Sequence, residues 1–441
     1  MRTGAGPKRF GILAHVGNGN LGDEATVAAL VQSIRDRQPD AEVVVFSENP
    51  ADTQARHGIR ALAIKRVIAA RVRRDSPRTS VASPLPKPSE TRAGRLKRRL
   101  KRVSWVYRPV KTLDRWLRFV LGLGPELRFF LASVRALRGV DRLIIAGGGQ
   151  LGDYFGGPWE YPFATLSWCL MARLAGARVA FMSVGAEPIT SPVSKRFFRW
   201  ALALADYRSF RDEGSRRLLA GIVASAHCRV FPDLVHGLRI ARPKRGPAAT
   251  QTPLIVGINP IPFFDSRYWA ESDDAVYQRY VEMLASFIVW LIARGDKVLF
   301  LPTQIRADPL VIADIQSAVR KNVGDAYESH VIRRHVHTFA DLANALAMVD
   351  VVVASRFHGI IFSYLFDRPV VGLSYYRKME ELMAGMGQGE YALAIRDADV
   401  EALKARFSHL EKNLDQAREE IARRREEYRR ALDVQYGLVL R

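Results

Sequence analysis

Short runs of β-branched and other apolar residues alternate along the chain with longer segments whose apolar positions recur every three or four residues. The first pattern is typical of buried strands and the second of amphipathic helices. Strands that alternate with helices predict an α/β fold with parallel sheets covered on both faces. The predicted strands are Phe10–Val16, Glu42–Phe46, Arg142–Ala146, Arg178–Val184, Tyr207–Phe210, Leu254–Asn259, Lys297–Pro302, Val331–Val336, Val351–Ala354 and Val370–Leu373. The predicted helices include Ala25–Arg37, Pro162–Leu174, Lys195–Leu204, Tyr277–Arg294 and Leu310–Val323.

A linker-like segment, Ala241–Pro253, divides this pattern into two doubly wound halves. We therefore expect a domain over residues 1–245, a second over 246–395 and a cleft between them. Ligands of such sheets bind beyond the carboxyl ends of the strands, so the loops after the strands matter most. From residue 396 to 441 the apolar positions form one helical stripe between charged faces, which predicts a C-terminal amphipathic helix packed against the body.

The composition excludes several classes of protein. With 48% apolar and 25% charged residues the chain is globular rather than disordered or fibrous. The longest apolar run, Leu284–Ala293, is too short to span a bilayer, and the N-terminus lacks the pattern of a secretory signal. Cys169 and Cys228 are too few for a disulfide framework and have no metal-ligand spacing, so we expect a cytoplasmic protein with no metal.

The positive charge is concentrated in one segment. Lys and Arg exceed Asp and Glu by 67 − 45 = 22 over the whole chain, and residues 56–138 hold 23 basic residues against four acidic ones. We interpret residues 65–125 as a basic insertion in the first domain. Basic residues interleaved with Trp105, Tyr107 and Trp116 suit an anionic membrane surface. A solvated insertion is the plainer alternative, and nucleic acid is the least favoured because no nucleic-acid module accompanies the charge.

A glycine-rich loop, His15–Ala25, follows the first predicted strand. Such loops often bind phosphate at a helix N-terminus, but Asp23 and Glu24 would repel it here. The phosphate-binding glycine motifs are also missing. These carboxylates, together with the amide of Asn18, suit sugar hydroxyls better. Simple helix capping by Asp23 remains the alternative.

A second glycine-rich loop, AGGGQLGD at Ala146–Asp153, directly follows another predicted strand. Three successive glycines let a ligand or a neighbouring loop approach the backbone closely. Asp153 would accept hydrogen bonds from ligand hydroxyls, and the alternative is a tight strand-to-helix turn.

Arg211 follows the short predicted strand Tyr207–Phe210 and would point into the cleft. Its guanidinium is suited to bidentate contact with a phosphate or a carboxylate. A structural salt bridge is the alternative interpretation.

The segment Val351–Met383 carries the strongest signal. A buried strand delivers Arg356 and His358 to its carboxyl end, and these two side chains project to the same side if the chain there is extended. The next strand ends close to Lys378. An arginine, a histidine and a lysine at adjacent strand ends predict an anion pocket with a group that titrates near neutrality.

Taken in order, these motifs resemble those of the polysaccharide pyruvyl transferase family. The resemblance runs from His15 to about Met386 and rests on GNGNLGDE, GGGQLGD, RDEGS, PDL, GINP and SRFHG. Members of that family resemble GT-B glycosyltransferases, with two Rossmann-like domains that face a cleft. They transfer a pyruvyl group from phosphoenolpyruvate to two hydroxyls of a sugar, which releases phosphate and leaves a cyclic ketal.

The resemblance implies roles for individual residues of this chain. Donor binding would fall to Arg211, Arg356, His358 and Lys378, with His358 as the catalytic acid. The acceptor would lie in the first domain and contact Asn18, Asp23, Glu24 and Asp153. Phosphoenolpyruvate would be a co-substrate, and no cofactor is expected.

We therefore expect a cytoplasmic pyruvyltransferase of exopolysaccharide or cell-surface glycan synthesis. Its saccharide acceptor would be free or lipid-linked, and the enzyme would then lie peripherally on the inner face of the membrane. Two alternatives remain open: a GT-B-like glycosyltransferase that uses a nucleotide sugar, and a non-catalytic basic binding protein. The sequence does not indicate an oligomeric state.

Overall fold

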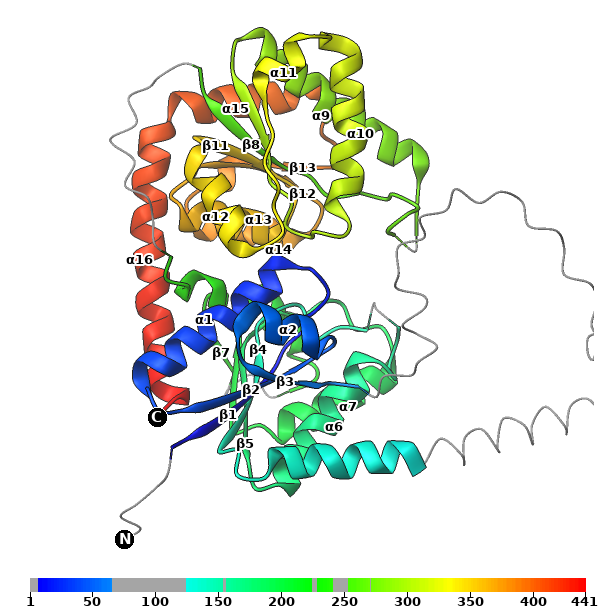
Figure 1. Ribbon diagram of the computed structural model, residues 1–441, viewed down its shortest axis with the longest axis vertical. Coiled ribbons are helices and arrows are strands. Elements are labelled where there is room, and N and C mark those ends of the chain that lie inside the picture. Colours follow the sequence, from blue (N-terminus) through cyan, green and yellow to red (C-terminus); the bar gives the residue numbers. More distant parts are fainter. Residues whose placement is uncertain (1–6, 66–123, 154–155, 224–227, 241–252, 270) are drawn as a thin grey trace, which may run out of the picture.

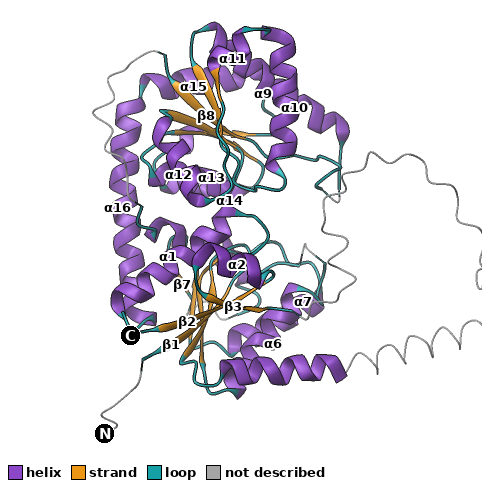
Figure 2. Cartoon of the chain, in the orientation of Figure 1, coloured by secondary structure: helices purple, strands orange, loops and turns teal. Residues whose placement is uncertain are grey.

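The computed structural model describes residues 7–65, 124–153, 156–223, 228–240, 253–269 and 271–441. Most of the basic insertion, including Trp105, Tyr107 and Trp116, and almost all of the linker-like segment lie outside these residues. The chain forms two lobes, each built on one sheet with helices on both faces (Figures 1 and 2). The α/β prediction of two parallel doubly wound sheets is confirmed.

The first sheet has seven strands in the order β3-β2-β1-β4-β5-β6-β7, and every pair is parallel. Its strands are β1 (Arg9–Leu13), β2 (Glu42–Ser47), β3 (Arg60–Ala63), β4 (Arg142–Ala146), β5 (Arg178–Val184), β6 (Tyr207–Phe210) and β7 (Arg229–Val230). Its helices are α1 (Leu21–Arg37), α2 (Pro50–His57), a helix over residues 124–137, α6 (Tyr161–Leu174), α7 (Pro192–Ala203), α8 (Glu213–Leu219) and the 3-10 turn η2 (Leu234–Gly237).

The second sheet has six strands in the order β10-β9-β8-β11-β12-β13, again all parallel. Its strands are β8 (Ile255–Asn259), β9 (Lys297–Phe300), β10 (Val331–Ile332), β11 (Val351–Ala354), β12 (Val370–Ser374) and β13 (Ala392–Ala394). Its helices are α9 (Asp274–Ala293), α10 (Asp308–Val323), α11 (Ala326–His330), α12 (Phe339–Met348), α13 (Phe357–Leu365), α14 (Arg377–Gly385), the turn η3 (Gly389–Tyr391), α15 (Val400–Lys412) and α16 (Leu414–Val439).

Both faces of the first sheet are buried, which explains why its central strands are apolar throughout. In β4, Leu143 and Ile145 pack towards α6 and α7, whereas Ile144 and Ala146 pack towards α1 and α16. Side chains of successive strand residues point to opposite faces, so a run without polar positions requires helices on both sides. In the second lobe α9 is apolar and long enough to cross a membrane by composition, but it packs inside the core of that lobe.

The predicted boundaries of β4, β5, β6 and β11 agree with the structure, whereas β3, β7 and β13 were not predicted. The predicted strand Val331–Val336 is wrong beyond Ile332, where β10 ends. The first helix begins at Leu21 rather than Ala25. Asn20 provides the N-cap, because its side chain accepts a hydrogen bond from the amide of Gly22, so capping by Asp23 is also wrong.

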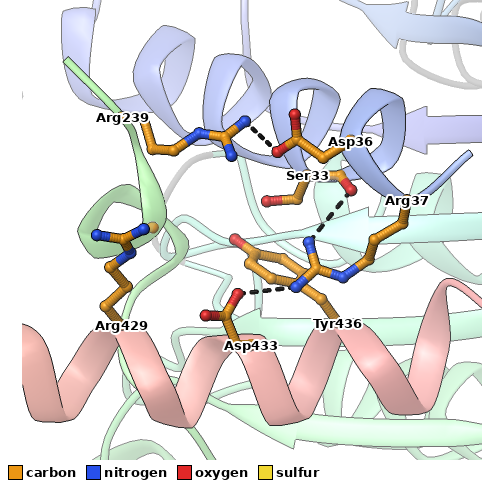
Figure 3. Close-up of a pocket in the computed structure, with 8 residues that line it drawn as sticks. Ser33, Asp36, Arg37, Arg239, Arg429, Asp433 and Tyr436 are labelled. Atoms are coloured by element: carbon orange, nitrogen blue, oxygen red, sulfur yellow. Dashed lines mark hydrogen bonds and ion pairs between the residues drawn. The ribbon is translucent and has the colours of Figure 1, made fainter. Parts of the chain in front are cut away.

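The predicted C-terminal helix is two helices, α15 and α16, and the second runs alongside both lobes (Figure 1). In the second lobe Arg425 forms an ion pair with Asp367 at 2.9 Å. Near its other end α16 faces α1, where Arg37 and Asp433 form an ion pair at 2.7 Å (Figure 3). Arg239 pairs with an aspartate of α1 in the same small pocket (Figure 3). Helix α16 therefore fastens the two lobes together.

Two backbone hydrogen bonds join the lobes directly. The amide of Leu21 donates to the carbonyl of Thr303 at 2.9 Å, and the amide of Ile305 donates to the carbonyl of Gly19 at 3.0 Å. The first glycine-rich loop therefore contacts the loop that follows β9. This contact aligns the start of α1 with the carboxyl ends of the strands in the second sheet.

Candidate active site

The loops that follow the strands of both sheets meet at the boundary between the lobes. Arg211 follows β6 of the first lobe, whereas His358 lies in the first turn of α13 and Lys378 in the first turn of α14 in the second lobe. The structure brings these three predicted donor residues together: Arg211 Nη1 and His358 Nε2 lie 3.3 Å and 3.9 Å from Asp233 Oδ2, and Lys378 pairs with Glu187 of the first lobe. Arg356, the fourth, has other partners.

Arg211 is held by carboxylates in a tightly packed position. Its Nη1 lies 3.3 Å from Asp233 Oδ2, its Nε lies 3.4 Å from Asp212 Oδ2, and its guanidinium stacks 4.3 Å from the centre of the Phe357 ring. A side chain at Gly185 would place its Cβ 2.5 Å from the Nε atom, so glycine is required there. Burial acts to lower the pKa of Arg211, but Asp233 and Asp212 outweigh it and raise the pKa.

His358 is buried and its ring is largely neutral in this state. Burial lowers the pKa of His358 to about 4, Asp233 opposes the shift, and Arg211 and Lys378 add to it. Its Nε2 atom lies 3.9 Å from Asp233 Oδ2 and has no hydrogen-bond partner among the described residues. The start of α1 touches the ring, since a Cβ at Gly22 would overlap with it. The imidazole therefore lies between the two lobes with one buried nitrogen that makes no hydrogen bond to the described residues.

Lys378 reaches across the boundary and forms an ion pair with Glu187, which follows β5. Both side chains are about four-fifths buried. Burial lowers the pKa of Lys378, and Glu187 opposes that shift. The second glycine-rich loop leaves room for the carboxylate, because Cβ atoms at Gly149 and Gly152 would lie 3.2 Å and 2.9 Å from atoms of Glu187. Gly149 and Gly152 therefore make room for the loop after β5, whereas Cβ atoms at Gly147 and Gly148 would lie 2.5 Å from Thr26 and 3.5 Å from Asp23 of α1.

The expectation that Arg356 and His358 project to the same side is wrong. The chain is not extended over these residues, because α13 begins at Phe357 and Arg356 is its N-cap residue. His358 is already in the first helical turn, where successive side chains point in different directions. The two side chains consequently have separate partners.

Arg356 forms a buried ion pair with Asp308 at the start of α10, with its Nε 2.9 Å from Oδ1. The other carboxylate oxygen of Asp308 accepts hydrogen bonds from the amides of Thr303 at 2.9 Å and Gln304 at 2.8 Å. These residues belong to the loop that contacts the first lobe. Arg356 therefore supports the contact between the lobes, and its guanidinium also lies 5.7 Å from the centre of the Tyr268 ring.

A second polar cluster lies in the first lobe around His15. The Nδ2 atom of Asn18 is 3.2 Å from His15 Nε2, and Glu48 Oε2 is 3.8 Å from the same nitrogen. The Tyr161 ring packs edge-on against His15 at 4.8 Å, and its hydroxyl donates to Glu48. These groups offer both donors and acceptors to a polar ligand.

Asp23 connects this cluster with the donor residues. Its Oδ2 atom is 3.9 Å from His15 Nδ1, and a Cβ at Gly148 would lie 3.5 Å from its Oδ1. Burial, followed by the negative charges of Glu24 and Asp233, raises the pKa of Asp23 to about 8. A carboxyl group with such a pKa exchanges protons near neutral pH, as a general acid or base must.

The other two predicted acceptor carboxylates are engaged within the protein. Glu24 accepts a hydrogen bond from the amide of Gly17 at 2.8 Å and lies 2.7 Å from His57 Nε2. Asp153 accepts hydrogen bonds from the loop before α7, including the Ser191 amide at 2.8 Å. Both groups hold loops in place, so Asp23 is the carboxyl group best able to contact an acceptor.

Sequence reasoning missed several side chains of the site. Asp233 and Glu187 were not selected, although Asp233 lies in the PDL segment that carried part of the resemblance. His15 and His236 were not selected either. In the structure His236 is buried, neither ring nitrogen has a partner among the described residues, and burial lowers its pKa to about 4. No sequence signal connects these residues to Arg211 or His358, because they converge only through the tertiary fold.

Comparisons with known proteins bear on the family and the fold. A family model described as polysaccharide pyruvyl transferase matches residues 20–376. No curated protein matches the chain in sequence.

The structure is similar to solved structures that include a putative epimerase and a glycosyltransferase. A complex of Staphylococcus aureus MnaA with UDP has a TM-score of 0.53 at 10% identity over 94% of this chain and 90% of its own. A putative UDP-N-acetylglucosamine 2-epimerase from Listeria monocytogenes has a TM-score of 0.52 at 10% identity, over 94% and 91%. A glycosyltransferase from Rickettsia africae has a TM-score of 0.51 at 9% identity, over 99% of both chains. At such identities the similarity establishes the GT-B-like fold alone, as predicted.

Proposed function

The chain belongs to the polysaccharide pyruvyl transferase family of transferases, and from this membership we propose that it transfers the pyruvyl group of phosphoenolpyruvate to two hydroxyls of a saccharide. The products are a cyclic pyruvate ketal and inorganic phosphate. The observation that carries the proposal is the convergence of Arg211, His358 and Lys378 at the boundary between the lobes.

The charge of the site supports a small donor with two anionic groups. Phosphoenolpyruvate carries a phosphate and a carboxylate on three carbons, so it requires several cations close together. Arg211 and Lys378 are buried and each faces a carboxylate, Asp233 and Glu187 respectively. A bound donor would replace some of these contacts with the protein carboxylates. The two cations would then neutralise the phosphate and the carboxylate of the donor.

His358 is the proposed general acid. Its pKa of about 4 leaves it neutral in the empty site, and the negative charge of a bound donor would raise that pKa. The imidazolium then gives its proton to the methylene carbon of phosphoenolpyruvate. The electron pair of the carbon–carbon double bond forms the new C–H bond, and C2 becomes an oxocarbenium-like centre.

The first acceptor hydroxyl attacks this carbon while a base takes its proton. Asp23 is the proposed base when ionised, because its pKa of about 8 permits proton exchange near neutrality. The bond from C2 to the phosphate oxygen then breaks and phosphate leaves with the electron pair. The second hydroxyl adds to C2 and loses its proton, which closes the ketal ring.

We place the acceptor on the side of the first lobe, where Asn18, His15 and Asp23 present hydrogen-bonding groups. Basic residues are attracted to anionic lipid, so a lipid-linked acceptor at a membrane surface fits the basic character of residues 56–138. The sequence has only two cysteines, too few for a disulfide framework, as suits a protein of the reducing cytoplasm. We therefore propose a cytoplasmic enzyme on the inner face of the membrane.

The test is incubation of the full chain with phosphoenolpyruvate and saccharides prepared from the cell. Phosphate release that depends on the saccharide, together with the mass gain of a pyruvate ketal, is the expected result. Release of phosphate without a ketal would contradict the proposal, and so would the absence of both products.

The second candidate is transfer of a sugar from a nucleotide sugar, since the fold resembles that of a protein solved with UDP. Under that function a nucleotide sugar would raise the melting temperature of the protein and phosphoenolpyruvate would not. Thermal unfolding with each ligand separately distinguishes the two donors.

A further inference from the structure

An exposed apolar surface covers two helices of the first lobe. We call it the aromatic patch and define it by Trp159, Phe163, Leu170 and Leu174 on and just before α6, and by Val193, Phe197 and Trp200 on α7. Trp159 is 68% exposed and Trp200 is 50% exposed, although tryptophan side chains are on average highly buried in folded proteins. Large contiguous patches of this kind mark sites of interaction.

The spacing of the residues makes the patch continuous. On α6 the members at 163, 170 and 174 fall on one side of the helix, and on α7 the same holds for 193, 197 and 200. The two stripes are in contact, since the Phe197 ring lies 5.4 Å from that of Trp159 and 5.8 Å from that of Phe163. The opposite sides of both helices pack into the core with Trp168 and Phe198.

The charged residues within α6 and α7 are all positive, and the nearby acidic residues Glu160 and Asp206 are paired with Lys65 and Arg173. Lys195, Arg196 and Arg199 are exposed on α7, and neither α6 nor α7 contains an acidic residue. Two copies of the chain that met symmetrically at this surface would bring like charges together. An anionic partner is therefore favoured over a second copy of the chain.

The basic insertion leaves and rejoins the described structure beside α6. Before it, the Nζ atom of Lys65 lies 4.3 Å from the centre of the Tyr161 ring at the start of α6. After it, the Phe129 ring packs 6.5 Å from that of Trp168 on the same helix. Residues 66–123 contain 17 Lys and Arg against three Asp and Glu. A strongly basic segment is thus attached at both ends to the helix that carries half of the aromatic patch.

We propose that the aromatic patch is the surface by which this protein docks on an anionic lipid bilayer. Exposed tryptophan and phenylalanine rings insert at the level of the lipid headgroups, and each nearby Lys or Arg adds about 1 kcal/mol of attraction to anionic lipid. Either signal alone gives weak binding, and the two together give stable attachment.

The patch lies next to the proposed acceptor side of the active site. Trp159 is two residues before Tyr161, whose ring contacts His15. A saccharide carried on a membrane lipid would therefore reach the site from the surface on which the protein rests. This route for the saccharide rests on the proposed function, whereas docking on the membrane does not.

The test measures sedimentation of the full chain with phosphatidylcholine vesicles, with or without about one-third phosphatidylglycerol. The variant Trp159→Ser/Trp200→Ser removes the two most prominent aromatic rings, and Val434→Ser/Leu438→Ser removes two exposed apolar side chains of α16 as a matched control. We expect the patch variant to bind anionic vesicles about tenfold more weakly or worse. The control variant should bind anionic vesicles like the wild type. Added salt should weaken the binding of the wild type and of the control variant.

Equal binding by the patch variant and the wild type would overturn the proposal, as would equal binding of the wild type to neutral vesicles. A wild-type dimer that the patch variant converts to monomers, without vesicle binding by either, would assign the patch to a second copy instead. Phosphate release with a water-soluble acceptor should be unchanged in the patch variant. If the wild type releases no phosphate but the patch variant still loses vesicle binding, the proposed reaction fails and the docking surface stands.

Discussion

Lys378 and Glu187, which are 191 positions apart in the chain, form an ion pair across the boundary between the two lobes. The lysine begins α14 in the second lobe and the glutamate follows β5 in the first. The pair is mostly buried, so each charge compensates the other where little water reaches them. Under the proposed function, a donor anion would replace the glutamate as the partner of the lysine.

The variant Lys378→Met should raise the KM for phosphoenolpyruvate about tenfold to a hundredfold, because it removes one charge-assisted hydrogen bond to the donor. It should also lower the melting temperature, since the carboxylate of Glu187 is left without its partner. Steady-state kinetics and thermal unfolding measure the two effects separately.

The double variant Lys378→Met/Glu187→Gln is the control for this interpretation. Removing both charges should restore the melting temperature to near that of the wild type and leave the KM high. Recovery of donor affinity in the double variant would show that Lys378 has no direct role in donor binding.

Replacement of His358 by Gln should lower kcat about 10²–10⁴-fold, since the side chain that supplies the proton to the donor is lost. Glutamine keeps a similar length, so the contact with the start of α1 is largely retained. His409→Gln is the matched control, because His409 is half exposed on α15 and pairs with Glu390. A His358→Gln enzyme with the kcat of the control would exclude His358 as the general acid.

Binding of phosphoenolpyruvate near pH 7 should draw about one proton from solution. His358 has a pKa of about 4 in the empty site, and the negative charge of the donor raises it. Calorimetric titration in two buffers with different ionisation enthalpies measures the uptake. The His358→Gln protein should bind the donor without taking up this proton. An unchanged uptake in that variant would show that another group is protonated.

The variant Asp23→Asn should be more stable than the wild type at pH 9 and differ little from it at pH 4. The pKa of Asp23 is raised to about 8 in the folded state, against 3.8 for an ordinary aspartate. Between these two pH values the folded protein keeps a proton on Asp23 that the unfolded chain has lost. This group therefore destabilises the wild type increasingly as pH rises to 8, by up to about 1.4 kcal/mol per pH unit. Melting temperatures at the two pH values test the prediction, and a constant difference would contradict it.

Gly22→Ala should reduce activity sharply, because the new methyl group would overlap with the His358 ring. The ring or the start of α1 must then shift, and the contact between the lobes shifts with it. Gly437→Ala is the control, since a Cβ there meets no atom within 4 Å and alanine favours the helix by about 0.5–1 kcal/mol. Equal activity of the two variants would mean that the lobes tolerate a wider separation at this point.

The sequence identified Arg211, His358 and Lys378 because each follows a predicted strand of an α/β pattern, and such positions meet at one edge of the sheet. It did not predict that Arg356 would turn away from His358, since that depends on α13 beginning at Phe357. The sequence also gave no reason to select Glu187 or Asp233. Asp233 and Glu187 matter because they pair with Arg211 and Lys378, and these two cations come from other elements of the chain.

By itself, the sequence determined the two parallel sheets, the family and most of the cations, because local periodicity and strand-end motifs are written in consecutive residues. Only the tertiary structure decided which groups share a site and in which protonation state. It pairs Lys378 with Glu187, leaves the ring of His358 neutral, keeps a proton on Asp23 and exposes the aromatic patch. The physical reason is that burial and charge at each atom depend on residues far apart in the chain, which only the folded packing brings together.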